Sequence, residues 1–414
     1  MRISVRDAEY SRIAVQSIKQ RRTDKDREMK ILILSFKAGE GHNSAAKAIL
    51  ERVQHEGHQA EIVDFLGLFS DKISNMVNVS YVGMVRHVPF LFGACYKFSY
   101  GASRMFGKVR SPLYLASDII SKRLTEYLEE NGPYDGIVAT HLMPAQALAH
   151  LKKHHYPLPA TVAVATDYTW YPFWQEVMAC DYYVIPNEAL TERYVKRGMP
   201  REKICPFGIP IGMRFLNLPT REEARAQLGF DADAKLYLMM GGSMGAGSMR
   251  RFAKELYEKR GDAELVIICG KNESLRHSLE KHFEGKSGVH LIGFTTEIPK
   301  YMVACDVLYT KPGGLSSSEA LVCRIPMVHT APIPGCESDN FRFFTQKGCS
   351  LGAKSIKKQL ACGVKLMESP TLRKQMKVEQ AKCAKPNASL NIFKLIERHA
   401  EEHDADQEEN IAEA

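Results

Sequence analysis

The first residue with a clear chemical use is a histidine in a glycine-rich turn. Residues 39–42, Gly-Glu-Gly-His, follow the apolar run 31–35 and open a helical pattern over 43–56. A glycine such as Gly41 lets a ligand approach the backbone, and a helix N-terminus favours anions. Imidazole titrates near neutral pH, so His42 could deprotonate an alcohol as a general base. Alternatively His42 only caps the helix, but its place at the carboxyl end of a strand favours a functional role.

A second glycine-rich turn could hold a phosphate. Residues 241–245, Gly-Gly-Ser-Met-Gly, follow the apolar run 236–240. The backbone N–H groups around Gly242 could bind a diphosphate, and the hydroxyl of Ser243 would add a donor. This turn is not a P-loop, because the Gly-Lys-Ser/Thr ending is missing. The alternative is that its glycines serve packing alone.

A third turn, residues 311–320, combines glycines with a carboxylate. Gly313 and Gly314 allow a tight turn at a helix N-terminus, and Glu319 follows one to two turns into that helix. A carboxylate there can accept two hydrogen bonds from a vicinal diol such as that of ribose. Alternatively, Glu319 simply offsets the helix dipole.

A fourth turn, residues 332–340, presents side chains that suit sugar hydroxyls. These are Glu337, Asp339 and Asn340. Carboxylates accept hydrogen bonds and an amide both donates and accepts them, which matches a ring of hydroxyl groups. Asp339 and Asn340 could equally cap a helix.

Two other groups of acids need an interpretation. Asp167 lies within residues 166–174, which are rich in aromatic residues. Their rings could stack on sugars or acyl chains, or they could instead pack between the two domains. Asp231 and Asp233 match an Asp-x-Asp metal pair but precede a strand, so we expect a solvated loop. With no other acid cluster, we predict no bound metal and no cofactor.

Alternating strands and helices must position these turns. Apolar runs predict a first series of strands at 31–35, 59–65, 135–140, 160–166, 181–186 and 203–207. After a linker around 216–220, where Thr220 and Glu223 form a capping box, a second series is expected at 236–240, 264–269, 289–292, 307–309 and 326–329. This alternation predicts an α/β protein with two doubly wound Rossmann-like domains facing a cleft.

Composition limits the class of protein. The 414 residues have a net charge of +8, with 45% hydrophobic and 25% charged residues. These values exclude a disordered, collagenous or disulfide-stapled chain and argue against nucleic-acid binding. The ten cysteines form no Cys-x-x-Cys pair, so we expect reduced thiols in the cytoplasm. No stretch reaches 18 apolar residues, and no signal peptide is evident.

One segment has the composition of a membrane-docking element. Residues 72–117 contain six cations, eight aromatic residues and no acid. Aromatic rings settle at lipid headgroups, and cations attract anionic lipid. The alternative is a helical subdomain with a basic surface. The lipid contacts that we expect in this segment are Arg86, Phe90, Phe92, Lys97, Arg104 and Phe106.

Taken in order, these motifs resemble the monogalactosyldiacylglycerol synthase and processive diacylglycerol glucosyltransferase family. The resemblance runs from about residue 30 to 352 and rests on the segments 39–46, 311–320 and 334–340. It implies a B-type glycosyltransferase fold, an inverting reaction without a catalytic metal, and peripheral binding to the inner face of the cell membrane. The implied partners are a UDP-sugar, diacylglycerol or a related lipid, and an anionic membrane surface.

The resemblance also implies roles for particular residues. His42 is similar to the base that deprotonates the acceptor, and Asp167 could assist it or position the acceptor. On the donor side, the resemblance implies that Gly242 and Ser243 contact the diphosphate and that Glu319 contacts the ribose. It implies that Phe294 and the turn to Ile298 contact the uracil. It also implies that Glu337 and Asn340 contact the hexose. The family often has Gln where this chain has Cys336, so the donor sugar could differ. It often has His where this chain has Tyr171, so the acceptor side could differ too.

The resemblance completes the expected organisation. We expect an N-terminal extension over 1–29, an acceptor and lipid-binding domain over 30–217 and a UDP-sugar-binding domain over 218–385. A C-terminal helix over 386–400 and a disordered acidic tail over 401–414 should follow. The expected reaction moves a hexose, glucose before galactose, from a UDP-sugar to diacylglycerol. A UDP-sugar 2-epimerase and a non-catalytic nucleotide-sugar-sensing membrane adaptor are the alternatives.

Overall fold

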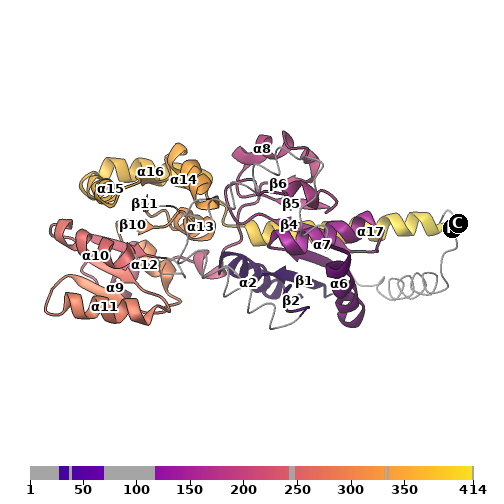
Figure 1. The fold of residues 1–414 in the computed structure, drawn as a ribbon, viewed down its shortest axis with the longest axis horizontal. Coiled ribbons are helices and arrows are strands. Elements are labelled where there is room, and N and C mark those ends of the chain that lie inside the picture. Colours follow the sequence, from indigo (N-terminus) through magenta and orange to yellow (C-terminus); the bar gives the residue numbers. More distant parts are fainter. Residues whose placement is uncertain are drawn as a thin grey trace.

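The computed structural model describes residues 28–36, 40–69, 117–241, 248–330, 332 and 335–412. Over these residues the chain forms two α/β units, each built on a six-stranded parallel sheet (Figure 1). The fold class predicted from the sequence is therefore confirmed. Two sets of predicted contacts lie outside the described residues, namely Gly242 and Ser243 of the diphosphate turn and Arg86, Phe90, Phe92, Lys97, Arg104 and Phe106 of the lipid segment.

The first sheet has the strand order β2-β1-β3-β4-β5-β6. Its strands are β1 (Lys30–Ser35), β2 (Gln59–Asp64), β3 (Gly136–Ala139), β4 (Ala160–Val164), β5 (Tyr182–Val184) and β6 (Ile204–Cys205). Helices cover both faces of a parallel sheet, so its central strands are apolar on both sides. Every residue of β3 and β4 is accordingly buried. All six strands coincide with predicted apolar runs, to within a few residues at their ends.

The second sheet has the order β12-β11-β10-β7-β8-β9. Its strands are β7 (Leu236–Met240), β8 (Glu264–Ile268), β9 (Val289–Ile292), β10 (Val307–Thr310), β11 (Met327–His329) and β12 (Leu351–Gly352). Five of these strands were predicted. The edge strand β12 was not, because two residues leave no periodic pattern.

Helices connect the strands of each sheet. In the first unit they are α2 (Glu40–His55), α6 (Ser117–Asn131), α7 (Leu142–Lys153) and α8 (Thr191–Val195). Those that follow are α9 (Arg221–Leu228), α10 (Ser248–Lys259), α11 (Glu273–Phe283), α12 (Ile298–Ala304), α13 (Gly314–Cys323), α14 (Cys336–Gln346), α15 (Ile356–Glu368), α16 (Pro370–Cys383) and α17 (Ala388–Ala412). The predicted capping box of Thr220 and Glu223 opens α9.

Within the described ranges, no helix combines the length and the apolar character needed to cross a bilayer.

The last helix returns to the first unit. Figure 1 shows α17 lying along the half of the molecule that contains β1 to β6. Ile392 and Ile396 are fully buried in the core cluster formed by β1, β3 and β4. Our expectation of a disordered tail from residue 401 is wrong for residues 401–412, which continue α17. Alanine, glutamate and glutamine have good helix propensity, and here it prevails over the acidic composition.

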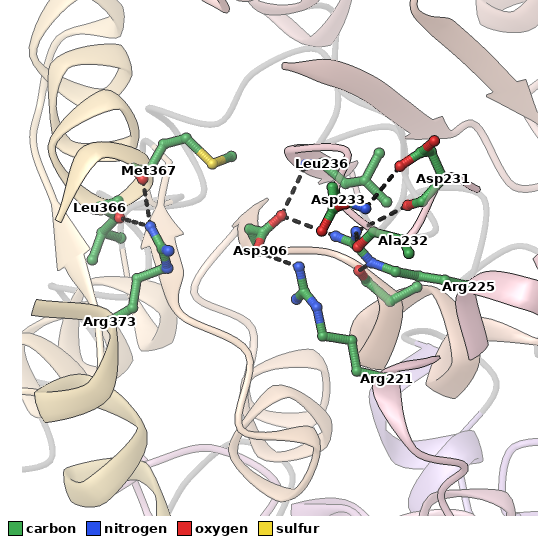
Figure 2. A network of polar contacts seen from close by, with 11 residues as sticks. Arg221, Arg225, Asp231, Ala232, Asp233, Leu236, Asp306, Leu366, Met367 and Arg373 are labelled. Atoms are coloured by element: carbon green, nitrogen blue, oxygen red, sulfur yellow. Dashed lines mark hydrogen bonds and ion pairs between the residues drawn. The ribbon is translucent and has the colours of Figure 1, made fainter. Parts of the chain in front are cut away.

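A buried arginine organises the start of the second unit (Figure 2). Arg225 is 2% exposed, and its guanidinium group donates to the carbonyl oxygens of Ala304, Asp231 and Ala232. The carboxylate of Asp306 accepts from Arg225 at 3.2 Å and from Arg221 at 2.7 Å. Asp231 and Asp233 are exposed, so the prediction of a solvated loop at these residues is confirmed.

Candidate active site

Three neighbouring strands bring polar residues to one edge of the first sheet. Strand β3 lies between β1 and β4, and its Ala139 is in register with Leu34 of β1. The residues that follow these strands therefore meet: His42 in the first turn of α2, Thr140 after β3 and Thr166 after β4. The strand order reverses between β1 and β3, which is where ligands bind in open α/β sheets.

The imidazole of His42 is held in one tautomer. Its Nδ1 lies 2.7 Å from the carbonyl oxygen of Thr140. A carbonyl oxygen only accepts hydrogen bonds, so Nδ1 carries the proton and Nε2 keeps the lone pair. Burial lowers the pKa of His42 below its usual value, and the charge of Asp167 opposes that shift. The result is a neutral ring at neutral pH with Nε2 able to accept a proton.

Two hydroxyl groups join His42 to Asp167. The Oγ1 atom of Thr166 lies 3.0 Å from Nδ1 of His42 and 3.3 Å from the hydroxyl oxygen of Tyr171. The Tyr171 hydroxyl donates to Oδ2 of Asp167 at 2.6 Å. Burial, reinforced by the charge of Asp167, raises the pKa of Tyr171 well above its usual value, so this hydroxyl stays a donor. Asp167 thus acts on His42 through its charge and through this chain of hydroxyls.

Asn340 connects this chain to the second unit. Its side-chain nitrogen donates to Oδ1 of Asp167 at 2.6 Å and to the carbonyl oxygen of Pro312 at 2.9 Å. Its side-chain oxygen accepts from the backbone N–H of Tyr168 at 2.7 Å. The side chain is fully buried, so both amide hydrogens and the carbonyl serve contacts within the protein. A hexose contact through the amide hydrogens of Asn340 would have to replace one of these bonds.

The neighbouring Asp339 also bridges the two units. Its carboxylate accepts from Thr169 and, at 3.3 Å, from Arg193, both in the first unit. Arg342, one turn further along α14, donates to it at 2.8 Å. The N-cap of α14 is Gly335. The alternative that Asp339 and Asn340 cap this helix is therefore wrong.

The glycines that open α13 have different surroundings. A Cβ atom on Gly314 would lie 2.0 Å from the carbonyl oxygen of Thr166 and 3.0 Å from Oδ1 of Asp167. Only a glycine allows this approach between the two units. Gly313 is the N-cap residue of α13, and a Cβ atom there would meet nothing within 4 Å. Gly314 thus serves the contact between the units, and Gly313 borders open space.

Glu319 is a buried acid on the same helix. It is 7% exposed, and burial raises its pKa to about 7, although the charge of Arg214 opposes the rise. A buried carboxyl group normally has partners. Helix α13 lies against α2, the helix of His42. The predicted contact of Glu319 with a ribose diol stays a prediction.

The other predicted donor contacts lie on separate elements. Gly41 is in the first turn of α2, and Glu337 is in the first turn of α14. Phe294 follows β9 and is 66% exposed, with the ammonium of Lys271 5.4 Å from its ring centre. Ile298 begins α12. These four assignments stay predictions.

Some residues of this site were missed at the sequence level. The sequence drew attention to Tyr171 only as a departure from the family pattern and to Thr166 only as part of an aromatic segment, and it gave no role to His141. His141 directly follows the predicted strand 135–140, as the turn of His42 follows its own strand, so the same rule would have found it. Among the described residues, no group of three or more His, Cys, Asp or Glu side chains could hold a metal ion.

Comparisons with known proteins give the context for this geometry. A family model described as monogalactosyldiacylglycerol (MGDG) synthase matches residues 42–211. A processive diacylglycerol beta-glucosyltransferase of Staphylococcus saprophyticus is 25% identical, over 83% of this chain and 85% of its own. The chloroplastic monogalactosyldiacylglycerol synthase 1 of Arabidopsis thaliana is 29% identical, over 80% of this chain and 63% of its own.

A solved structure supports the fold. The crystal structure of MurG from Acinetobacter baumannii superposes with a TM-score of 0.58 and 14% identity, covering 90% of this chain and all of that one. The two sequence relatives are named as glycolipid synthases, not as the epimerase or the adaptor considered as alternatives. Over most of its length the chain is therefore similar to the monogalactosyldiacylglycerol synthase and processive diacylglycerol glucosyltransferase family of enzymes.

Proposed function

We propose that this enzyme transfers a hexose from a UDP-sugar to the free hydroxyl of diacylglycerol, with glucose favoured over galactose. The observation that carries the proposal is the state of His42. Its Nδ1 proton is bound by the carbonyl of Thr140, so its Nε2 is available as a base at the sheet edge where ligands bind. The family match adds the substrate class, since the sequence relatives are named for diacylglycerol products.

The proposed reaction uses this geometry. As Nε2 of His42 takes the acceptor proton, the acceptor oxygen forms a bond to the anomeric carbon. The bond from that carbon to the β-phosphate oxygen breaks, and its electron pair leaves with UDP. Attack opposite the leaving group inverts the anomeric centre. Asp167 stabilises the imidazolium that forms, through its charge and through Tyr171 and Thr166.

The second unit supplies the donor site in this proposal. Backbone N–H groups at the starts of its helices stabilise the departing diphosphate in place of a metal ion. Glu319 binds the ribose diol, and the exposed ring of Phe294 meets the uracil. The remaining donor contacts are assigned to Gly41, Gly242, Ser243, Ile298, Gly313, Gly314, Glu337 and Asn340.

The acceptor is a lipid, so the enzyme must reach a membrane surface. We assign this to residues 72–117, through Arg86, Phe90, Phe92, Lys97, Arg104 and Phe106. Six cations without an acid favour an anionic surface, at about 1 kcal/mol for each cation. The enzyme would then work as a peripheral protein on the inner face of the cell membrane.

A matrix of donors and acceptors tests the proposal. The full chain is incubated with UDP-glucose, UDP-galactose or UDP-N-acetylglucosamine, in anionic vesicles with or without diacylglycerol, and the products are identified by mass. We expect hexosyl-diacylglycerol and UDP, most from UDP-glucose, and no sugar product without the lipid. An epimerised UDP-sugar in the lipid-free arm, or no glycolipid with any donor, would reject the proposal.

A further inference from the structure

A second histidine lies beside the base and is not used by the reaction described above. His141 follows β3, and the ring centroids of His42 and His141 are 4.7 Å apart at an interplanar angle of 88°. The register of β1 and β3 explains this position. Leu34 is paired with Ala139, so two residues further along each chain Phe36 comes next to His141. The rings of Phe36 and His141 stack at 4.2 Å with an interplanar angle of 11°. The imidazole is therefore fixed on one face by an aromatic ring.

The hydrogen bonds of His141 determine what its ring can do. As the N-cap residue of α7, it accepts a hydrogen bond at Nδ1 from the backbone N–H of Met143, at 3.2 Å. Nδ1 must then be unprotonated, so the proton of the neutral ring is on Nε2. Burial, together with the charge of a protonated His42, lowers the pKa of His141 well below its usual value, so the ring is neutral. No hydrogen bond to Nε2 is made by the described residues, and the side chain is half-buried.

The two histidines therefore have opposite capacities. His42 offers a lone pair at Nε2, and His141 offers an N–H group at Nε2. His141 has no remaining acceptor atom and cannot serve as the base. An adjacent acceptor and donor suit a ligand that has a hydroxyl group close to a second oxygen. Diacylglycerol has this pattern, because its free hydroxyl lies next to an ester carbonyl on the neighbouring glycerol carbon.

We infer that His141 is an acceptor-positioning residue, whose Nε2–H donates to the ester carbonyl of the diacylglycerol while His42 takes the proton of the hydroxyl. This inference rests on the proposed function. The contact would hold the acceptor hydroxyl toward the anomeric carbon, which is how positioning groups contribute to catalysis. It would also favour diacyl over dialkyl glycerols, since an ether has no carbonyl oxygen.

Two variants separate the donor from the helix cap. His141→Asn keeps an acceptor at the position of Nδ1 and is a good N-cap residue, so it should keep the cap of α7 although it loses the ring stacked on Phe36. Its shorter side chain cannot place an N–H where Nε2 lies. His141→Gln reaches that place with an N–H group but loses the cap. If His141 were only a cap, Asn would be harmless and Gln would be the damaging change in both stability and activity.

The test combines these variants with two acceptors. The full chain is assayed with the UDP-hexose that it uses, in phosphatidylglycerol vesicles containing dioleoylglycerol or its dialkyl ether analogue. With the diacyl acceptor, His141→Asn should raise the acceptor KM or lower kcat by roughly threefold to tenfold, the range for one neutral hydrogen bond. Its KM for the donor should stay unchanged. Its Tm should fall less than that of His141→Gln, which loses the cap, yet His141→Gln should recover part of the lost activity.

The ether acceptor supplies the deciding comparison. When the ester acceptor is replaced by the ether, the kcat/KM of the wild-type enzyme should fall by a similar factor. The kcat/KM of His141→Asn should fall little further, because the substitution and the ether each remove the same hydrogen bond. If the ether lowered the kcat/KM of His141→Asn by the same factor as that of the wild type, the inference would be overturned. Wild-type kinetics for His141→Asn with the diacyl acceptor would also overturn it. If the wild type transferred no hexose to either glycerolipid, the proposed function itself would fail, and this inference with it.

Discussion

At the residue scale, the proposed mechanism divides acid–base chemistry between groups on one sheet edge. The carbonyl of Thr140 fixes the tautomer of His42, and burial keeps the ring neutral. Two hydroxyl groups separate Asp167 from His42, so in this proposal Asp167 stabilises the protonated base without taking the proton. The arrangement separates the group that moves the proton from the group that supplies the charge.

Substitution of Asp167 should change the pH dependence of turnover. The charge of Asp167 raises the pKa of His42, so Asp167→Asn should lower that pKa. His42 would then stay unprotonated to lower pH, and the acid limb of the kcat/KM profile should move to lower pH. We also expect kcat to fall roughly tenfold to a hundredfold, because the imidazolium loses its counter-charge.

The matched control for this change is Tyr171→Phe. It removes the hydroxyl between Asp167 and Thr166 but leaves the carboxylate. Its acid limb should stay close to that of the wild type, while kcat falls. An acid limb that does not move in Asp167→Asn would contradict the electrostatic role given to this residue.

Glu319 should make stability depend on pH. Burial raises its pKa to about 7 from an ordinary value of 4.5, so folding favours the protonated form. The stabilising contribution is present below about pH 4.5 and is lost as the pH rises toward and through 7. Glu319→Gln cannot ionise, so its Tm should exceed that of the wild type by a few degrees at pH 8.

Thermal unfolding across pH 5 to 8 checks this expectation. The control is Glu284→Gln, which changes an exposed glutamate that follows α11 in the same unit. The Tm difference between Glu319→Gln and the wild type should grow with pH, whereas that of Glu284→Gln should stay flat. Parallel curves for Glu319→Gln and the wild type would mean that this carboxyl group is ordinary in the folded protein.

At the element scale, most of the strands could be predicted from the sequence. Long apolar runs such as β1 and β7 are read directly as buried parallel strands. The two-residue strand β12 gave no pattern, and the acidic end of α17 was mistaken for a disordered tail. The N-terminal half of α17 is held by tertiary packing against the first unit. Because that packing stabilises the helix, the local composition of its acidic end does not reveal it.

Helix α17 should contribute strongly to the stability of the first unit. Ile396 is fully buried, and a Cβ atom on Gly136 of β3 would lie 2.4 Å from its Cγ2 atom. Ile396→Ala should cost about 2–5 kcal/mol, the range for deletions of a large buried aliphatic side chain. Lys394→Ala changes an exposed residue of the same helix and should leave the unfolding free energy nearly unchanged. Equal denaturation midpoints for the two variants would contradict this packing.

At the scale of the whole molecule, the base and the second unit are connected. Asn340 and Asp167 are 173 positions apart in the sequence and are joined by a hydrogen bond of 2.6 Å. The sequence placed both residues in turns after strands, and the structure shows that they meet. Their contact could not be predicted, because it depends on how one sheet is oriented against the other. The same limit applies to Gly314, whose role is in the contact between the units.

The approach of α13 to the first unit should tolerate no side chain at Gly314. In Gly314→Ala the new methyl group would lie 2.0 Å from the backbone oxygen of Thr166, so the two units must separate locally. We expect a lower Tm and a large loss of transferase activity. Gly313→Ala adds the same methyl group where nothing lies within 4 Å, so its Tm should match the wild type. Equal Tm values for the two variants would show that the units do not pack this closely.

The proposed mechanism requires the imidazole of His42 to take the acceptor proton while the other unit holds the nucleotide. The most direct measurement compares His42→Ala with the wild type in hexose transfer to diacylglycerol, alongside calorimetric UDP binding. We expect transfer to fall by roughly a hundredfold or more, whereas the Kd for UDP should stay within about twofold, a change of only ~0.4 kcal/mol. Wild-type transfer rates in His42→Ala would contradict the assignment of the base.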